Sequence, residues 1–491
     1  MNHLLIRRIT SSHSSLAKPP FLEHNNNVNT VQQSPPLILI TTRIRRRSYV
    51  SPSSKFEFIK KRKKKTQFEI QVLDQCVSGQ IKKLDDALGY FDKLVSLNPL
   101  PSIETFNHLF ISISKLRCHS SVFPLYNKMK WIGIQPNIFT FNILINSCCQ
   151  LRGVNYGFCL FGEILKRGYH PNIITFNTLV KGVCVQGMNR FALQVFDKMT
   201  TSGVSPTVFT YNILIDSMYK QGEMEEAKRL FEEMIKLGKE PDVITFNSMI
   251  DGLCSTGKID EARKLFDSMV GKGLEHDLYS FSVLINGYCK KFKVDDALQL
   301  FEKMKQKGIK PTQVTYTTLL DGLCRAKKVT IARSLLLEME STGVSPNIVT
   351  YNAMLDGLCK NGHIDEVIEL FQSMKLKGCK ADIHTYGLVI DGLFKGGKYE
   401  DAKKLFHEIP NQGLVPNVRT YTIMISGMCR EGNLLEAEKL IFEMERNGCM
   451  PNAVTCETII KGFLERKDVE KAKKFLQIMR QRNFSPSNSL I

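Results

Sequence analysis

The sequence lacks the short motifs of common catalytic and metal sites. It has no G-x-x-x-x-G-K-[ST] loop for nucleotide phosphates, no H-E-x-x-H zinc motif and no C-x-x-C pair. Its many Asp and Glu residues recur with a fixed period and form no cluster at metal-ligand spacing. We therefore expect a protein that is not an enzyme and that needs no metal and no cofactor.

Long apolar runs are also missing. A helix that crosses a membrane needs about 18 or more apolar residues in succession. The longest candidate run, Leu37–Ile40, follows a pair of prolines and is far shorter than that. We expect no membrane span.

Cysteines are present, but not in a pattern typical of disulfides. Seven of the 14 occupy one place in a repeated segment, which favours a small buried side chain at a tight helix contact. Free thiols in this number imply a reducing compartment, or one that tolerates them. The seven are Cys149, Cys184, Cys254, Cys289, Cys324, Cys359 and Cys429.

Positive charge is concentrated at the start of the chain. Residues 1–67 hold 14 Lys and Arg against 2 Asp and Glu, whereas the remainder holds 53 against 46. A leader rich in Arg and Ser and poor in acids is typical of an organelle transit peptide. The arginines favour a mitochondrion, with a chloroplast as the alternative. A nuclear signal is the other interpretation of Lys60–Lys65, but we favour a solvated linker there and expect 1–67 to be disordered.

A period of 35 residues organises the rest of the chain without insertions. The repeats begin at residues 103, 138, 173, 208, 243, 278, 313, 348, 383, 418 and 453. A gap-free period of this length indicates a solenoid in which each repeat buries its face on its neighbours. Three places of the repeat recur almost unchanged: one glycine, one methionine and one phenylalanine. The glycines are Gly133, Gly168, Gly203, Gly238, Gly273, Gly308, Gly343, Gly378, Gly413 and Gly448. The methionines are Met129, Met199, Met234, Met269, Met304, Met339, Met374, Met444 and Met479, with Ile164 and Ile409 as substitutes, and the phenylalanines are Phe161, Phe196, Phe231, Phe266, Phe301, Phe371 and Phe406.

Residues 243–277 show what one repeat predicts. A first helix runs from Ile244 to about Ser255, and a turn follows at Gly257. We expect Asp260 to cap a second helix and Gly273 to end it in a left-handed conformation. The fold class is therefore all-α, a solenoid of about 12 helix-turn-helix repeats.

The predicted domains follow from the same period. Residues 68–102 keep only the second-helix pattern of a repeat, so we expect a degenerate N-terminal repeat that caps the array. Eleven tandem repeats fill 103–487, and 488–491 form a C-terminal stub.

The openings of the repeats resemble those of a known family. They read T-F-N-I-L-I-N-S-C-C (Thr140–Cys149), T-Y-N-I-L-I-D-S-M-Y (Thr210–Tyr219) and T-Y-N-A-M-L-D-G-L-C (Thr350–Cys359), and closings such as G-I-Q-P-N and G-V-S-P-N accompany them. The chain resembles a pentatricopeptide repeat protein of the P class, in its restorer-of-fertility-like plant subset. Peptide-binding tetratricopeptide repeats have a period of 34 and a tryptophan in the first helix, whereas the single tryptophan here, Trp131, lies late in a second helix.

The resemblance implies a right-handed superhelix that binds single-stranded RNA with one base per repeat. The fifth and the last residues of each repeat would converge and read the base edge. Helix capping or turn chemistry is the alternative for any single one of these residues. The implied base-reading residues are Asn107, Asn137, Asn142, Asn172, Asn177, Thr207, Asn212, Asp242, Asn247, Asp277, Ser282, Thr312, Thr317, Asn347, Asn352, Asp382, Asn417, Thr422 and Asn452; Gly387, Glu457 and Ser487 complete the set without a base assignment.

Two further places carry implied RNA contacts. The second residue of a repeat would stack on bases, as Phe139, Ile174, Phe209, Ile244, Tyr279, Val314 and Val349, with His384 and Arg419 also able to stack and Glu104 poorly suited. The thirteenth residue would contact phosphate, as Lys115, Lys220, Lys290, Arg325, Lys360, Lys395 and Arg430. The alternative for these cations is simple attraction to the negative end of the first helix.

With the pairing preferences of the family, the expected RNA site is pyrimidine in the first three places, then U, U, purine, A, U, any base, A, any base. We expect a monomer that acts on organellar transcripts by stabilisation, processing or translation, with a recruited factor as a further partner. A protein-binding scaffold and a nuclease are the other two classes. Variation confined to the fifth and last places disfavours the scaffold, and missing metal ligands disfavour the nuclease. A C-terminal deaminase-like domain is not expected, since His407-Glu408 has no C-x-x-C partner.

Overall fold

The computed structural model describes residues 65–487, and this part of the chain is helical without any strand. Residues 1–64 of the predicted leader and linker (1–67) and the predicted C-terminal stub (488–491) lie outside the described residues. The first described helix, α2 (Gln67–Val77), begins at the last residue of the predicted linker. Thr66 caps it, since Oγ1 of Thr66 accepts a hydrogen bond from the Glu69 amide at 3.2 Å.

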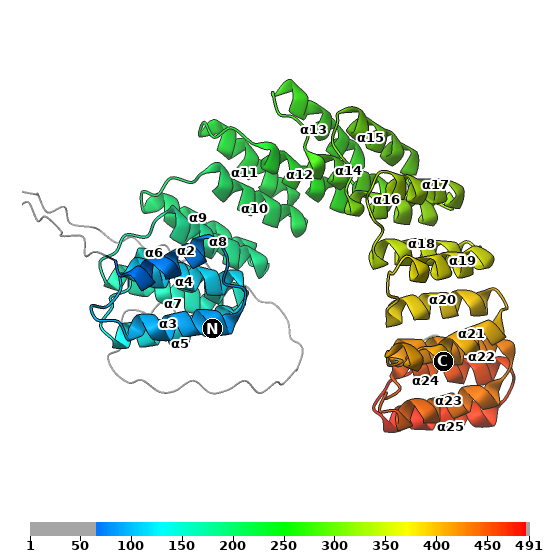
Figure 1. Cartoon of the computed structure of the whole chain (residues 1–491). Helices are drawn as coiled ribbons and strands as arrows, with labels where there is room; N and C mark the ends of the chain where they lie inside the picture. Colours follow the sequence, from blue (N-terminus) through cyan, green and yellow to red (C-terminus); the bar gives the residue numbers. More distant parts are fainter. Residues whose placement is uncertain (1–64, 488–491) are drawn as a thin grey trace, which may run out of the picture. The chain divides into compact units, whose positions relative to one another are not determined.

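The chain divides into two compact units, one ending at Ser205 and one beginning at Pro206. Both consist of antiparallel helix pairs, and most helices have 13 residues (Figure 1). The N-terminal unit contains α2, α3 (Leu84–Val95), α4 (Ile103–Lys115), the short 3-10 helix η1 (His119–Ser121), α5 (Val122–Trp131), α6 (Ile138–Gln150), α7 (Val154–Lys166), α8 (Ile173–Val185) and α9 (Asn189–Thr201).

The C-terminal unit contains eight helix pairs. These are α10 (Val208–Lys220) with α11 (Met224–Lys236), α12 (Val243–Ser255) with α13 (Ile259–Gly271), α14 (Leu278–Lys290) with α15 (Val294–Gln306), α16 (Gln313–Arg325) with α17 (Val329–Ser341), α18 (Ile348–Lys360) with α19 (Ile364–Leu376), α20 (Ile383–Lys395) with α21 (Tyr399–Glu408) and the 3-10 helix η2 (Pro410–Gln412), α22 (Val418–Glu431) with α23 (Leu434–Arg446), and α24 (Ala453–Glu465) with α25 (Val469–Gln481).

First helices form the inner scaffold of each unit. In the C-terminal unit, α10, α12, α14 and the following even-numbered helices to α24 each pack on the next, and α4, α6 and α8 do so in the N-terminal unit. From α7 onward, each second helix packs mainly on the first helix of its own repeat. Because the first helices are in contact from repeat to repeat, they present the same residue places side by side.

The recurrent glycines have the predicted left-handed conformation. All ten recurrent glycines lie in the left-handed region, and Asn483, which replaces glycine in the last repeat, has φ 60°. Gly273 illustrates the reason, because a φ of 73° after α13 reverses the chain at little cost only without a Cβ atom. The eleven Met and Ile side chains at the recurrent apolar place are all fully buried.

Aromatic side chains join successive repeats. Phe266 of α13 is fully buried and meets Phe281 of α14 edge to face, with ring centroids 5.2 Å apart. The same contact joins Phe301 to Tyr316 at 5.3 Å and Phe371 to Tyr386 at 5.5 Å. Since each second-helix Phe packs on the following repeat, no repeat completes its core alone.

The recurrent cysteines fill a close contact between first helices, as predicted. A Cβ atom added to Gly322 would lie 2.6 Å from Sγ of Cys289, and one added to Gly392 would lie 2.3 Å from Sγ of Cys359. Burial raises the pKa of the Cys289 and Cys359 thiols to about 12, so both stay protonated and act as small apolar groups.

The predicted cap of the second helix is wrong. Lys258 occupies the N-cap position of α13 and makes no side-chain cap hydrogen bond. Asp260 instead lies in the first turn, where its carboxylate suits the positive end of the helix, and it accepts a hydrogen bond from Lys293 of the following repeat at 3.2 Å. Side-chain caps of second helices occur in only two of the described repeats, at Asn433 of α23 and Asp468 of α25.

Candidate nucleic-acid interface

The last residue of one repeat caps the first helix of the next. Oδ1 of Asn137 accepts a hydrogen bond from the Thr140 amide at 3.0 Å, and the Asn137 amide donates back to Oγ1 of Thr140 at 3.2 Å. This capping box satisfies amide groups that a helix start leaves without partners. The same N-cap position is held by Asn172, Thr207, Asp242, Asp277, Thr312, Asn347, Asp382, Asn417 and Asn452. Capping, the alternative role for these residues, is therefore a real structural role of this place.

The fifth residue converges on the same cap, as predicted. Nδ2 of Asn107 donates to Oδ1 of Asn137 at 3.1 Å, while Oγ1 of Thr140 donates to Oδ1 of Asn107 at 2.8 Å. An Asn amide has two N–H donors and an oxygen with two lone pairs. The two bonds of Asn107 use one donor and one lone pair of its amide, which leaves one of each. The Asn142–Asn172, Asn212–Asp242 and Asn247–Asp277 pairs repeat the direct contact at 3.4, 3.0 and 3.2 Å.

In other repeats, the link to the following repeat runs through the third-place hydroxyl. Thr317 and Thr350 lie 2.8 Å apart through their hydroxyls, and so do Thr422 and Thr455. In the repeat that starts at 348, Oγ1 of Thr385 donates to Oδ1 of Asn352 at 2.8 Å.

Four further members of the set have these surroundings. Ser282 hydrogen-bonds to the Leu278 carbonyl of its own helix at 2.8 Å, and its hydroxyl also lies 3.3 Å from that of Thr315. Oε1 of Glu457 accepts from the Ser487 amide at 2.8 Å. Asn177 is buried on α8 in the N-terminal unit, whereas Thr207 caps α10 in the C-terminal unit. Because the two residues belong to different units, we describe each one separately.

Burial and hydrogen bonding set the charge of the reading pairs. The fifth-place residues Asn107, Asn142 and Asn247 are only 6%, 6% and 3% exposed, so their orientation is fixed before any ligand arrives. Partial burial opposes ionisation of Asp277, but hydrogen bonds from Ser280 and Asn247 outweigh it and hold the pKa of that carboxyl below its ordinary value. At neutral pH this cap is a charged acceptor.

One fifth-place Asn has a buried oxygen that makes no hydrogen bond to the described residues. Oδ1 of Asn247 is buried without a hydrogen-bond partner there. The next repeat has Ser280 where others have Thr, and Oγ of Ser280 bonds to Asp277 instead, at 2.8 Å. Asn247 therefore keeps both lone pairs of its oxygen for another donor.

The second residues are exposed, as stacking requires. The seven predicted side chains are between 50% and 69% exposed although all are apolar or aromatic. His384 and Arg419 are also exposed, and Nη1 of Arg419 lies 3.4 Å from Nδ1 of His384. Glu104 pairs with Lys65 at 3.3 Å. Large apolar side chains held in solvent at one place of most repeats are typical of a binding surface.

Grooves bring these places together within each unit. A groove of about 1280 Å³ in the N-terminal unit is lined by Asn107, Asn137 and Asn142 together with Phe139 and Ile174. In the C-terminal unit, a hollow of about 400 Å³ is lined by Thr317, Asn347, Val314, Val349 and Asp321. Reading, stacking and charged residues thus share one surface in both units.

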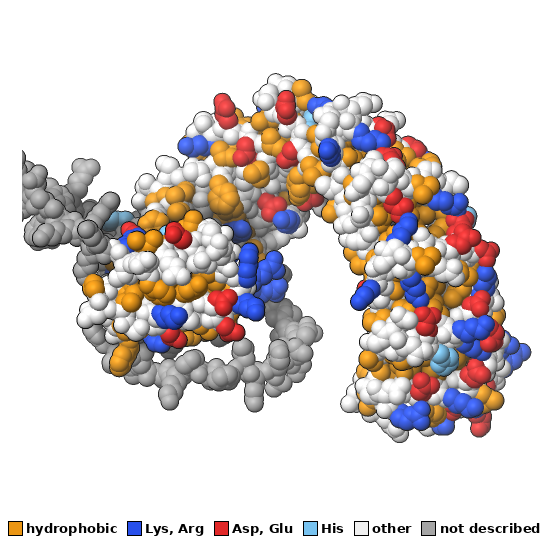
Figure 2. All heavy atoms as spheres, in the orientation of Figure 1, with side chains coloured by type: hydrophobic (Ala, Val, Ile, Leu, Met, Phe, Trp, Pro, Cys, Tyr) orange, Lys and Arg blue, Asp and Glu red, His pale blue; other side chains and the backbone are white. Residues whose placement is uncertain are grey.

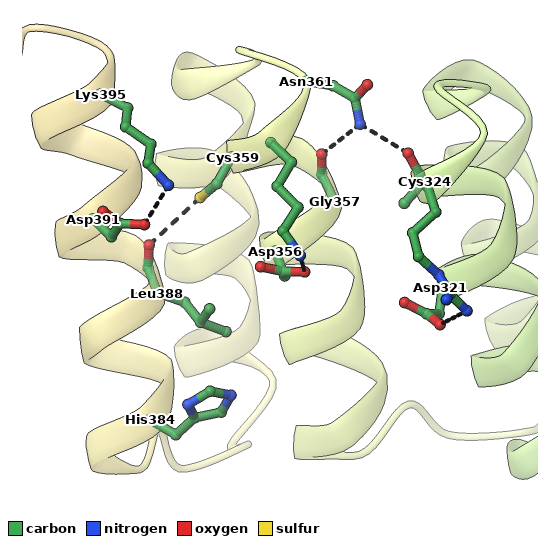
Figure 3. A network of polar contacts seen from close by, with 12 residues as sticks. Asp321, Cys324, Asp356, Gly357, Cys359, Asn361, His384, Leu388, Asp391 and Lys395 are labelled. Atoms are coloured by element: carbon green, nitrogen blue, oxygen red, sulfur yellow. Dashed lines mark hydrogen bonds and ion pairs between the residues drawn. The ribbon is translucent and has the colours of Figure 1, made fainter. Parts of the chain in front are cut away.

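The thirteenth-place cations differ from the prediction in one respect, because four of the seven are already paired. Their partners lie one turn earlier on the same helix, at the ninth place of the repeat. Figure 3 shows the acids Asp321, Asp356 and Asp391 repeated on α16, α18 and α20. The pairs are Lys220–Asp216 at 2.7 Å, Arg325–Asp321 at 2.5 Å, Lys360–Asp356 at 2.6 Å and Lys395–Asp391 at 2.6 Å.

Two sets of residues at this surface escaped the sequence prediction. The first is the third-place hydroxyl, such as Thr140 or Thr385, which links a reading residue to the cap after it. In most repeats this residue is a Thr that follows an Asn, Asp or Thr by three positions. That spacing is typical of a capping box. The second set is the ninth-place acids. Each paired acid precedes a cation by four residues on one helix, and this spacing alone predicts an ion pair.

The described residues hold no group of three or more His, Cys, Asp or Glu side chains placed to bind a metal ion. Between residues 65 and 487, no helix combines the length and apolar character needed to cross a membrane.

Comparison with known proteins agrees with this geometry. A sequence model described as the PPR repeat family matches residues 101–150, 171–220, 206–255, 241–290, 283–325, 314–360, 346–395, 386–430 and 423–465, and a PPR repeat model matches 139–169 and 454–484. The crystal structure of the pentatricopeptide repeat protein PPR10 from maize has 22% identity and a TM-score of 0.50, and the match covers 86% of this chain and 69% of that one.

Two RNA complexes are more distantly similar. PPR10 with an 18-nt psaJ RNA element has 20% identity and a TM-score of 0.37, over 86% of this chain and 80% of that one. Yeast Rmd9p with a 16-nt target RNA has 12% identity and a TM-score of 0.42, over 84% and 90%. The family models match almost the whole array from 101 to 484, so the chain belongs to the pentatricopeptide repeat family.

Proposed function

We propose that this protein binds single-stranded RNA in a sequence-specific way, with one base read by each repeat. The observation that carries the proposal is the convergence of the fifth and last side chains, as in Asn107 and Asn137 at 3.1 Å, beside exposed apolar second residues. Membership of the pentatricopeptide repeat family, whose member PPR10 has a structure with an 18-nt psaJ RNA element, supports the ligand class.

The chemistry of recognition follows from the groups left outward. A base inserts between the exposed second residues of successive repeats, for example Val314 and Val349, and stacks on their apolar surface. Its edge then meets the donor and acceptor that the reading pair retains. Because the pair differs among repeats, each place favours a different base, and good contacts of this kind discriminate by about 1–3 kcal/mol.

The test is selection of bound RNA from a random pool, followed by a change of one reading residue. The selected consensus is expected to read pyrimidine three times, then U, U, purine, A, U, any, A, any. In the repeat with Asn352 and Asp382, Asn352→Thr is expected to shift the preference from U toward G at that place alone.

A matched control uses the same chemical change at a place that reads no base. Asn286 lies on α14 at the ninth place and lines the hollow near Thr317. Asn286→Thr is expected to leave the preference at every position unchanged. An Asn352→Thr variant that weakens all RNAs equally, or that keeps the preference for U, refutes base reading by these residues.

The protein acts on transcripts as an adaptor rather than as a catalyst in this proposal. Bound along its groove, the RNA is covered against exonucleases, and a processing or translation factor supplies any further activity. RNA incubated with the pure protein and Mg²⁺ is expected to remain intact. Cleavage of the selected RNA by the protein alone contradicts this part of the proposal.

The place of action is a mitochondrion. The Arg-rich, acid-poor leader of residues 1–67 supports this part of the proposal. A fluorescent fusion of residues 1–70 is expected to accumulate in mitochondria. Accumulation in plastids or in the nucleus overturns it.

A further inference from the structure

The ninth place of the first helices decides whether the groove cations are neutralised. In the repeats that start between 208 and 418, this place holds Asp216, Asp251, Asn286, Asp321, Asp356, Asp391 and Ser426. Four of the five acids pair with the cation one turn later. Lys290 and Arg430 follow Asn286 and Ser426, and Lys115 of the N-terminal unit follows Ile111, so these three cations have no carboxylate one turn before them.

Asp251 extends the same row without a cation on its own helix, where Ser255 holds the thirteenth place. Burial raises the pKa of Asp251, and the charges of Lys220 and Lys290 on the neighbouring first helices oppose that rise. The carboxylate thus lies in the field of both lysines. Acids and cations alternate from α10 to α20 along the first helices.

These acids belong to the groove and not to an unrelated face. Asp321 lines the hollow that also contains Thr317 and Asn347. The side chains of Asp321, Asp356 and Asp391 are 43%, 33% and 36% exposed, so a ligand in the groove can approach them. Figure 2 shows positive and negative side chains intermixed over α17 to α25, so the face of these helices in view carries no broad patch of one sign.

Stability does not account for the pairs, because exposed ion pairs contribute little to folding. Their electrostatic effect on a polyanion is larger. A phosphate that meets an isolated lysine is neutralised and releases a condensed cation, which gives affinity for any RNA sequence. A phosphate that meets Lys395 with Asp391 already 2.6 Å from its Nζ atom gains no net neutralisation.

We propose that the ninth-place aspartates hold sequence-independent RNA binding low, so that base reading decides which RNA is retained, and that Lys115, Lys290 and Arg430 make the main phosphate contacts. The inference rests on the proposed function, and it adds a second class of specificity-determining residue to the reading pairs. The aspartates set how strongly any RNA is attracted, and the pairs set which one is preferred.

The experiment compares the full chain with an Asp321→Asn, Asp356→Asn, Asp391→Asn variant. The dissociation constant is measured over a range of salt for the selected RNA and for a scrambled RNA. With three cations released, the slope of log Kd against log salt is expected to steepen by about 2, since single strands give about 0.7 per phosphate neutralised. Both RNAs are expected to bind on the order of tenfold more tightly at low salt, and their ratio is expected to stay the same.

A matched control carries the same charge change elsewhere. Asp260, Asp295 and Asp365 lie in the first turns of second helices and pair with Lys293, Lys328 and Lys398 of the following repeats. Their triple change to Asn is expected to leave the salt slope close to that of the parent. The converse variant, Asn286→Asp with Ser426→Asp, places carboxylates one turn before Lys290 and Arg430 and is expected to weaken both RNAs and flatten the slope.

The outcomes separate the two proposals. If the parent shows no preference for any RNA, the proposed function fails. If the parent is selective but the Asp321, Asp356 and Asp391 variant binds more weakly, the aspartates hold the cations in place for phosphate, and the inference is overturned. An unchanged slope, or equal effects in the second-helix control, overturns it as well, while thermal melting shows that each variant is folded.

Discussion

Single side chains at the ends of the repeats serve two purposes at once. Asp382 caps α20 through the Thr385 amide at 2.8 Å, and the Thr385 hydroxyl lies 2.8 Å from Oδ1 of both Asp382 and Asn352. One hydroxyl proton is thus shared between the cap and the reading residue. Helix capping and base reading are compatible because the oxygen that caps points inward, while the outer face of the pair remains available.

The third-place hydroxyl is therefore predicted to orient the reading residue. Thr385→Val keeps the shape of the side chain but removes the donor to Asn352 and Asp382. Losing a hydrogen bond of this kind costs about 0.5–1.5 kcal/mol, so discrimination of U at that one place is expected to fall by roughly threefold to tenfold. Binding of RNAs that vary at this place is the measurement.

Thr385→Ser is the control, since Ser280 fills the same place in the repeat that starts at 278 and bonds to its cap at 2.8 Å. It is expected to retain most of the discrimination. Equal loss in the Val and Ser variants would show that packing of the methyl group, rather than the hydroxyl, positions Asn352.

Helices are the scale at which sequence reasoning worked best here. Apolar spacing and recurrent Gly predict both helices of a repeat, the buried Met place and the left-handed ends such as Gly273. The reading pairs could be placed only through the family resemblance, because Asn107 and Asn137 are 30 residues apart and meet only when repeats stack. The cap of the second helix was mispredicted because Asp260 lies two residues after the N-cap position, which Lys258 holds.

Contact between neighbouring first helices gives an element-scale prediction. Gly392→Ala puts a Cβ atom 2.3 Å from Sγ of Cys359, and overpacking of this kind costs about 1–3 kcal/mol. Part of the cost is offset because Ala favours a helix over Gly by about 1 kcal/mol. The variant is expected to melt below the parent.

Cys359→Ala in the same chain removes the sulfur and leaves the nearest remaining side-chain atom, Cβ, at 3.2 Å. The double variant is expected to recover stability relative to Gly392→Ala alone, and a double-mutant cycle measures the coupling. Additive effects of the two changes would contradict direct contact between these residues.

At the scale of the whole molecule, stability is spread over a line of similar repeats. Each repeat contacts mainly its neighbours within a unit, so the loss of one contact is expected to act locally rather than through a common core. Hydrogen exchange is the measurement that distinguishes these cases, because it reports the opening of each helix separately.

Phe266→Ala tests this locality. Phe266 is fully buried, packs on Phe281 of the next repeat and stacks on His276 at 3.8 Å. Truncation of a buried Phe costs about 3–5 kcal/mol, so amide protection is expected to fall in α12 to α15 and to persist in α22 to α25. Phe442→Ala on α23, where the ring is 51% exposed, is the control and is expected to change little. Equal loss of protection across α10 to α25 would mean that the C-terminal unit unfolds as one cooperative body, and unchanged protection in α13 and α14 would mean that Phe266 does not join these repeats.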